Sequence, residues 1–179
     1  MQIKQSPINF ENIRFPRELE ADNTVETIRR VLFTNAVLLR PESDFAVPSI
    51  EMNGSLKKAL RQAKLQCHIR CGFDAIAGKL QSEKEGIANV CKRTDAPQGK
   101  RISRLILFSN DCAPRLYRHI EQLLTIHSPR LLCCLINMES EAFGHLINHK
   151  DNKIKVIMVE NKNAVCEILR TMIVKPDTN

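Results

Sequence analysis

Short apolar runs alternate with stretches of helical periodicity along the second half of the chain. Each run has the length of a buried strand and falls far below the roughly 20 residues needed to cross a bilayer. The runs are residues 105–108, 131–136 and 154–159. Apolar positions at helical spacing fill the intervals at residues 114–124, 139–147 and 164–172. Strands that alternate with helices favour a parallel sheet covered on both faces.

The segment before this alternation adds two helices and a fourth strand. After Asn53 and Ser55, two residue types that cap helices, residues 56–64 combine an apolar stripe with basic positions. Residues 65–70 alternate between apolar and polar side chains, and residues 74–81 return to helical spacing. The elements together predict an α/β fold, an α-β-α sandwich with a central mixed, largely parallel four-stranded sheet and an N-terminal extension.

The first part of the chain is expected to lie outside this domain. Residues 1–23 show no sustained period and predict an extended arm. Residues 24–39 have near-helical spacing, although 36–39 fit a strand equally well. Pro41 and Pro48 bracket a polar stretch that predicts a linker. The predicted division is an extension and linker at 1–50, the α/β domain at 51–173 and a tail at 174–179.

A long basic segment follows the second helix of the predicted domain. Residues 82–101 have no apolar period and contain Gly86, Pro97 and Gly99. We interpret them as a surface loop of a length that is uncommon unless functional or disordered. Because the loop is rich in cations, we expect it to become ordered when it binds RNA. The alternative is that it is simply disordered.

The formal charge of +7 favours an anionic partner, because clustered cations release counterions when they meet phosphates. A solvated basic surface is the competing explanation. Only 4% of residues are aromatic and none is tryptophan, which disfavours base stacking as the main mode of binding. Contacts to RNA shape and phosphates are then expected to dominate.

Signals for cofactors, metals and secretion are weak. The glycines form neither a dinucleotide-binding nor a P-loop pattern, so no cofactor is expected. The seven cysteines include no C-x-x-C pair, and Cys133 and Cys134 should point to opposite faces of one strand. The start of the chain has no apolar signal region, so an intracellular protein with reduced thiols and no metal site is expected.

Cys112 begins a helix, where the pKa of a thiol can fall, but no positioned base accompanies it.

Three segments together resemble the kink-turn RNA-binding superfamily typified by the archaeal L-seven-Ae ribosomal protein. Cys-Gly-Phe-Asp-Ala-Ile at 71–76 lies where that family has a Gly-x-Asn-Glu turn. Residues 105–114 end in Asp-x-x-Pro like the family's second strand and third helix, and Glu-Ala-Phe-Gly at 141–144 is similar to its Glu-x-Leu-Gly helix. The resemblance covers residues 54–172 and implies the family's fold and RNA binding.

The chain departs from the family at the residues that engage sheared G·A pairs. Asp74 stands in place of Asn, Ala75 in place of Glu, and Gly78 in place of Lys, with Lys79 directly after it. A close approach of RNA to the backbone at Gly72 is still expected, because glycine leaves room there. An ordinary affinity for kink-turn RNA is not expected.

The altered turn, the basic insertion and the N-terminal extension together resemble the ribonuclease P and ribonuclease MRP subunit family, Pop-three in fungi and Rpp-thirty-eight in animals. That resemblance implies a non-catalytic subunit of a nuclear and nucleolar ribonucleoprotein whose RNA supports precursor tRNA and precursor rRNA processing. The implied partners are the structured RNA of the particle and its other protein subunits, reached through the N-terminal extension, with no membrane.

The residues expected to contact RNA lie in the first helix, at the Gly72 turn, in the basic insertion and in the loop after Gly144. Their alternatives are a solvated face for the first helix, an ordinary helix start at Gly72, loop disorder for the insertion, and completion of the core for Ile147. The candidates are Lys57, Arg61, Lys64, Arg70, Gly72, Asp74, Ala75, Lys79, Lys92, Arg93, Lys100, Arg101, Arg104, Ile147, His149 and Lys150.

Three other functional classes stay open. One is a ribosomal or small nucleolar ribonucleoprotein component of the same fold. Another is a protein–protein interaction module that uses this fold without RNA, which would show an apolar rather than a basic binding surface. An RNA-modifying enzyme is disfavoured, because no fuller catalytic constellation emerges from the residue spacing.

Overall fold

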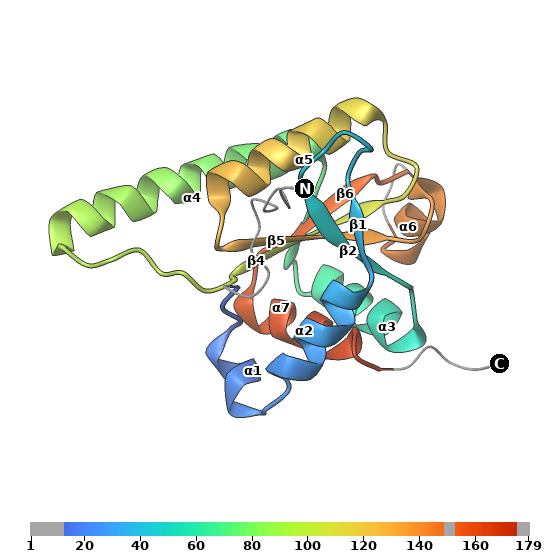
Figure 1. Ribbon diagram of the computed structural model, residues 1–179, viewed down its shortest axis with the longest axis horizontal. Coiled ribbons are helices and arrows are strands. Elements are labelled where there is room, and N and C mark those ends of the chain that lie inside the picture. The colour runs from blue at the N-terminus through green and yellow to red at the C-terminus, as the bar shows by residue number, and fades with distance from the viewer. Residues whose placement is uncertain (1–12, 149–152, 175–179) are drawn as a thin grey trace, which may run out of the picture.

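The computed structural model describes residues 13–148 and 153–174, and its apolar runs form a six-stranded sheet of order β1-β2-β5-β4-β6-β3 (Figure 1). The strands are β1 Ala36–Leu38, β2 Ala46–Ile50, β3 Ile69–Cys71, β4 Arg104–Ser109, β5 Leu131–Ile136 and β6 Val156–Val159. β5 pairs in parallel with β2 and β4, whereas the other pairings are antiparallel. The sheet is mixed, as expected, but it is less parallel than expected and has two more strands.

Helices cover both faces of the sheet, which confirms the α-β-α sandwich (Figure 1). One apolar cluster packs α1, α2, α3, α6 and α7 on one face, and another packs α4 and α5 on the opposite face. Cys134 belongs to the first cluster and Cys133 to the second, as their adjacency on one strand predicts. The helices are α1 Arg17–Ala21, α2 Val25–Thr34, α3 Gly54–Leu65, α4 Phe73–Thr94, α5 Pro114–His127, α6 Ser140–Leu146 and α7 Lys162–Thr171.

The two additional strands come from the segment expected to be an arm and a linker. β2 pairs with β1 as far as Pro48 and with β5 from Ser49 onward. The proline therefore lies where the strand changes partners, so its missing N–H costs little. Phe15 and Leu32, from the same part of the chain, are fully buried in the core. The linker expectation is wrong for residues 46–50, because they form a strand within the sheet.

The basic segment after Leu80 is largely helical rather than a loop. α4 continues for 22 residues to Thr94, and Asp95 ends it in the left-handed conformation. Leu80 is its last buried residue, and the distal half of α4, residues 81–94, projects beyond the sheet (Figure 1). The prediction of a loop at residues 82–101 is thus wrong for all but its final part.

Two boundaries around the α3–β3 connection and α5 also differ from the expectations. α3 continues through Leu65, and the strand begins only at Ile69, because Cys67 turns the chain with a φ of 58°. Ala113 is the N-cap residue of α5, so this helix begins at Pro114, two residues after Cys112.

The described helices include none that is both long enough and apolar enough to cross a membrane.

Candidate nucleic-acid interface

Helix α3 separates its apolar and basic residues onto different faces. The Asn53 side chain caps the helix by accepting a hydrogen bond from the backbone N–H of Leu56 at 2.7 Å. Leu56, Leu60 and Ala63 are buried against the core, whereas Lys57 and Arg61 are exposed. Within residues 13–148 and 153–174, no ion pair joins Lys57, Arg61 or Lys64 to a carboxylate. These three cations are therefore available to an anionic ligand.

Two contacts join the basic face of α3 to neighbouring segments, one distant in the sequence and one close to α3. Arg61 Nε donates to the backbone oxygen of Leu146, at the end of α6, over 3.1 Å. Lys64 Nζ lies 4.0 Å from Cys71 Sγ, directly before Gly72. Burial raises the pKa of the Cys71 thiol, and the nearby Lys64 charge opposes that rise. The thiol therefore stays neutral and contributes no negative charge to this surface.

The turn at Gly72 opens α4 in a conformation that requires glycine. Its φ is 88°, and its backbone N–H donates to Val156 O at 3.1 Å, which fixes the turn on β6. A Cβ at this position would meet nothing within 4 Å, so the space above the backbone is open. Asp74 and Ala75 follow in the exposed first turn of the helix. We define Lys57, Arg61, Lys64, Gly72, Asp74 and Ala75 as the α3–Gly72 surface.

Several candidates near this surface have other roles in the structure. Ile147 is 1% exposed and completes the core, which is the alternative that the sequence left open. Arg70 forms an ion pair with Glu160. His149 and Lys150 lie outside the described residues.

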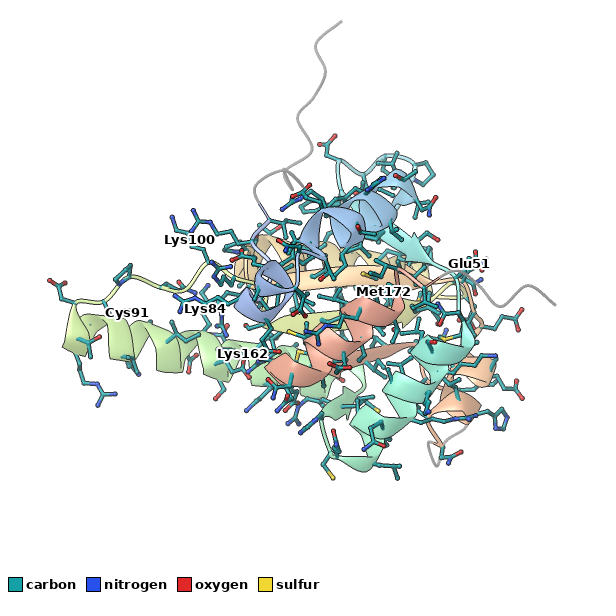
Figure 2. All side chains as sticks on the ribbon, turned by 90° about the horizontal axis from the view of Figure 1, so that it is seen from below. Glu51, Lys84, Cys91, Lys100, Lys162 and Met172 are labelled. Atoms are coloured by element: carbon teal, nitrogen blue, oxygen red, sulfur yellow. The ribbon has the colours of Figure 1, made fainter. Side chains whose placement is uncertain are left out.

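The remaining candidates lie away from the α3–Gly72 surface. α4 has 22 residues, so its basic end is about 33 Å from the turn. Lys92 and Arg93 are exposed at that end, and Figure 2 shows Lys100 on the segment that returns toward the sheet. The sequence candidates therefore form two separate groups rather than one continuous track.

Three cations of this second region already have protein partners. Arg101 pairs with Glu20 and donates to Phe15 O at 2.7 Å. The Arg104 side chain is only 17% exposed and donates from Nε and Nη2 to the Glu83 carboxylate, and Lys79 lies 3.8 Å from the same carboxylate. Binding RNA through them would require breaking these pairs.

The residues with nucleophilic or metal-binding chemistry do not form a reactive cluster. Cys112 is 9% exposed, and burial raises the pKa of its thiol, opposite to the fall that a helix start can cause. His119 stacks on Phe73 with ring centroids 4.8 Å apart. Among the described residues, no three His, Cys, Asp or Glu side chains converge as metal ligands would.

Asp111 connects the end of β4 to the start of α6. It accepts hydrogen bonds from the backbone N–H of Ser140 at 3.0 Å and from the Ser140 and Ser109 hydroxyls. Desolvation raises the pKa of Asp111, but these hydrogen bonds outweigh it, so the pKa is lowered overall. This carboxylate has a structural role beside the candidate interface.

Sequence reasoning missed a groove of about 770 Å³ between α3 and α7. Lys58, Gln62 and Gln66 line its α3 side at a spacing of four residues. That spacing was the available signal, but single Gln residues are common on solvated helix faces.

The chain matches no protein-family model and no curated protein. It is similar to the solved structure of a protein with unknown function from Bacillus halodurans C, with 13% identity over 68% of this chain and 98% of that one, at a TM-score of 0.48. It is also similar to a 15.5kD RNA binding protein from Giardia lamblia, with 14% identity over 67% of this chain and 88% of that one, at a TM-score of 0.43.

Proposed function

We propose that the chain binds structured RNA through the α3–Gly72 surface. The observation that carries this proposal is the set of three α3 cations that form no ion pair with any described carboxylate, together with the open turn that follows Cys71. The Lys64–Cys71 contact joins these cations to the turn, and the Arg61–Leu146 hydrogen bond joins them to the end of α6. Cations in a row along one helix suit successive phosphates. An open glycine at a helix start leaves the positive end of the helix accessible to an anion.

The acidic and small residues of the turn shape the kind of RNA that binds. Asp74 carries negative charge beside the phosphates, and Ala75 provides no hydrogen-bonding side chain for a base. We therefore expect the RNA to be held through its backbone and shape, with a weaker preference for a simple kink-turn than the resembling family has.

We further propose that the protein is a non-catalytic subunit of the ribonuclease P and ribonuclease MRP particles, supporting precursor tRNA and precursor rRNA processing in the nucleus and nucleolus. The support is the sequence resemblance at 71–76, 105–114 and 141–144 together with the RNA surface proposed above. Neighbouring protein subunits are expected to contact the N-terminal part of the chain. The isolated protein should not cleave precursor tRNA.

A salt titration with paired variants tests RNA binding at this surface. Arg61→Gln with Lys64→Gln should weaken binding and lower the slope of log affinity against log salt by roughly one to two, since each lost phosphate contact contributes about 0.7–0.9. Lys92→Gln with Arg93→Gln removes the same charge at the far end of α4 and serves as the matched control. A larger effect of the control pair would move the interface to the distal half of α4.

Purification of the tagged protein followed by sequencing of the bound RNA tests the choice of particle. Enrichment of the ribonuclease P and MRP RNAs is expected. Ribosomal or small nucleolar RNA in their place would assign the protein to another particle of the same fold. Recovery of proteins without RNA would favour the interaction-module alternative.

A further inference from the structure

Helices α3 and α7 run antiparallel on one face of the sheet (Figure 2). The 770 Å³ groove lies between them. Hydrogen bonds fix the helix pair at both ends of the groove. At one end, Asn53 Nδ2 donates to Thr171 O at 3.1 Å. At the other end, His68 N donates to Ala63 O and Glu160 N donates to His68 O, each at 2.9 Å. The groove is therefore part of the fold rather than a gap between loosely placed helices.

Two facing rows of polar side chains form the walls of this groove. One row is Lys58, Gln62 and Gln66 of α3, and the other is Asn163, Glu167 and Thr171 of α7, each at a spacing of four residues. Alanines at positions 59, 63 and 164 lie between the rows and leave room for a flat ligand. Across the described parts of the chain, the side-chain amides of Gln62, Gln66 and Asn163 have no hydrogen-bond partner.

At one end of the groove, His68 has a ring nitrogen without a hydrogen-bond partner among the described residues. Its Nδ1 atom is buried and has no hydrogen-bond partner, and it is the only such buried side-chain atom among the described residues. Buried polar atoms are normally paired, so His68 brings an unsatisfied nitrogen to the lining of the groove.

We infer that this groove binds one unpaired nucleotide of the RNA, an inference that rests on the proposed function for its source of ligand. Side-chain amides place a donor beside an acceptor, which matches the edge of a nucleobase. Lys58 supplies a cation for the phosphate, and Glu167, the carboxylate that lines the groove, is paired with Arg170. A volume of this size falls in the usual range for small-ligand sites, about 300–1,000 Å³.

The position of the groove on α3 connects it to the proposed RNA surface. Lys57 and Arg61 immediately precede Lys58 and Gln62 in the sequence, so the basic row and the groove row lie on adjacent flanks of one helix. An RNA backbone bound along the basic row thus passes beside the groove. A nucleotide unstacked from that backbone can enter between α3 and α7.

Titration of the full chain with the common ribonucleoside monophosphates, followed by NMR of the side-chain amides, tests the inference. Saturable shifts of the Gln62, Gln66 and Asn163 amides are expected, with a dissociation constant on the order of 1 mM for the best base. The double variant Gln62→Ala, Gln66→Ala should weaken binding about tenfold. Gln122→Ala, at an exposed Gln of α5 on the opposite face of the sheet, is the matched control and should bind like the parent.

A second variant guards against loss of folding. Ala59→Leu fills the groove with a good helix former and should abolish the shifts while the protein still unfolds cooperatively. No saturable shift with any nucleotide would overturn the inference, as would identical shifts with inorganic phosphate, which would define an anion site only. Saturation by peptides but not nucleotides would do the same and identify a protein-docking groove.

The result separates the two proposals. Nucleotide binding in the groove without binding of structured RNA would contradict the proposed function and leave the nucleotide site standing. If structured RNA binds in a way that depends on Arg61 and Lys64 but the groove binds no nucleotide, only the inference about the groove is contradicted.

Discussion

Gly72 adopts a backbone angle that other residues reach only with strain. Its φ of 88° predicts that Gly72→Ala lowers the free energy of unfolding by about 1–3 kcal/mol, although the added methyl meets no atom. Gly78→Ala makes the same chemical change inside α4, also in open space, and should stabilise the protein by about 0.5–1 kcal/mol. Urea unfolding of both variants measures whether each substitution lowers or raises the free energy of unfolding. Equal effects would mean that the turn does not hold this conformation in solution.

Asp74 tests whether the first turn of α4 lies against RNA. Asp74→Asn removes a negative charge near the phosphates, so affinity for a kink-turn RNA should rise about two- to fivefold, corresponding to about 0.4–1 kcal/mol. Stability should change little, because the N-cap is Gly72 and the structure shows no capping hydrogen bond from a side chain at this helix start. Asp95→Asn at the other end of α4 is the matched control. A gain with Asp95→Asn alone would place the RNA at the distal half of α4.

Glu121 of α5 links this helix to the turn between β1 and β2 through an ion pair and hydrogen bonds. It binds Arg40 at 2.8 and 3.2 Å and accepts a hydrogen bond from Ser43. Desolvation raises the pKa of Glu121, but the Arg40 and Ser43 hydrogen bonds outweigh it and lower the pKa from 4.5. Its charge therefore stabilises the fold fully above pH 4.5, and the stabilisation is lost as the pH falls through the lowered pKa.

This linkage predicts a pH-dependent effect of Glu121→Gln. At pH 7 the variant should lose roughly 1–3 kcal/mol of stability, because Arg40 then keeps only its exposed ion pair with Glu42. The difference from the parent should shrink as the pH falls below 4.5, because protonation then removes the same charge from the parent. Urea unfolding across this pH range checks the prediction. A difference that stays constant with pH would contradict the ion pair.

Among the helices, α4 divides into a packed half and a projecting half. Ile76 and Leu80 are its buried residues, and none lies in the distal half. Short helices without tertiary packing are marginal in water. We expect amides of the distal half to exchange with deuterium faster than those of α5, where Ile120 and Leu124 are buried. Equal protection in mass-spectrometric exchange would show that a partner or a second molecule covers the distal half.

Sequence periodicity predicted the elements that bury a continuous apolar pattern. β4, β5 and α5 lie where their apolar runs indicated, because burial fixes which positions can be apolar. β2 was missed because Pro48 disfavours a strand unless the strand changes partners at that residue. The distal half of α4 was missed because it has no buried face and contains Gly86.

Sequence reasoning predicted individual residues of the site better than their arrangement. The basic spacing of Lys57, Arg61 and Lys64 is visible in the sequence, but their contact with Leu146 and Cys71 depends on how α3 packs beside α6 and β3. No local pattern distinguishes Arg104, which is paired with Glu83, from an available cation. Tertiary contacts decide both cases.

For the whole molecule, residues 13–50 contribute buried side chains to the core beneath the sheet. Phe15, Leu19, Ile28 and Leu32 are fully buried, each worth about 1.5–3 kcal/mol, and a domain's total stability is only about 5–15 kcal/mol. A chain that begins at residue 51 should therefore lose cooperative unfolding. The division at residue 50 stays untested, and the packing argues against it.

Thermal and urea unfolding of two truncated proteins would decide this point. Deletion of residues 1–12 is the control, because it removes none of the buried side chains named above. A cooperative transition in the chain that begins at residue 51 would restore the N-terminal part to the status of a detachable extension.

Both edges of the sheet are formed by strands of only three residues, β1 and β3. A long open edge is a template on which a second molecule can add its own strand, and short edge strands prevent this. The protection matters most at β1, where Val37 and Leu38 are 37% and 55% exposed. The brevity of these strands thus limits edge-to-edge aggregation, and loss of β1 would create the hazard of amyloid-like pairing along β2.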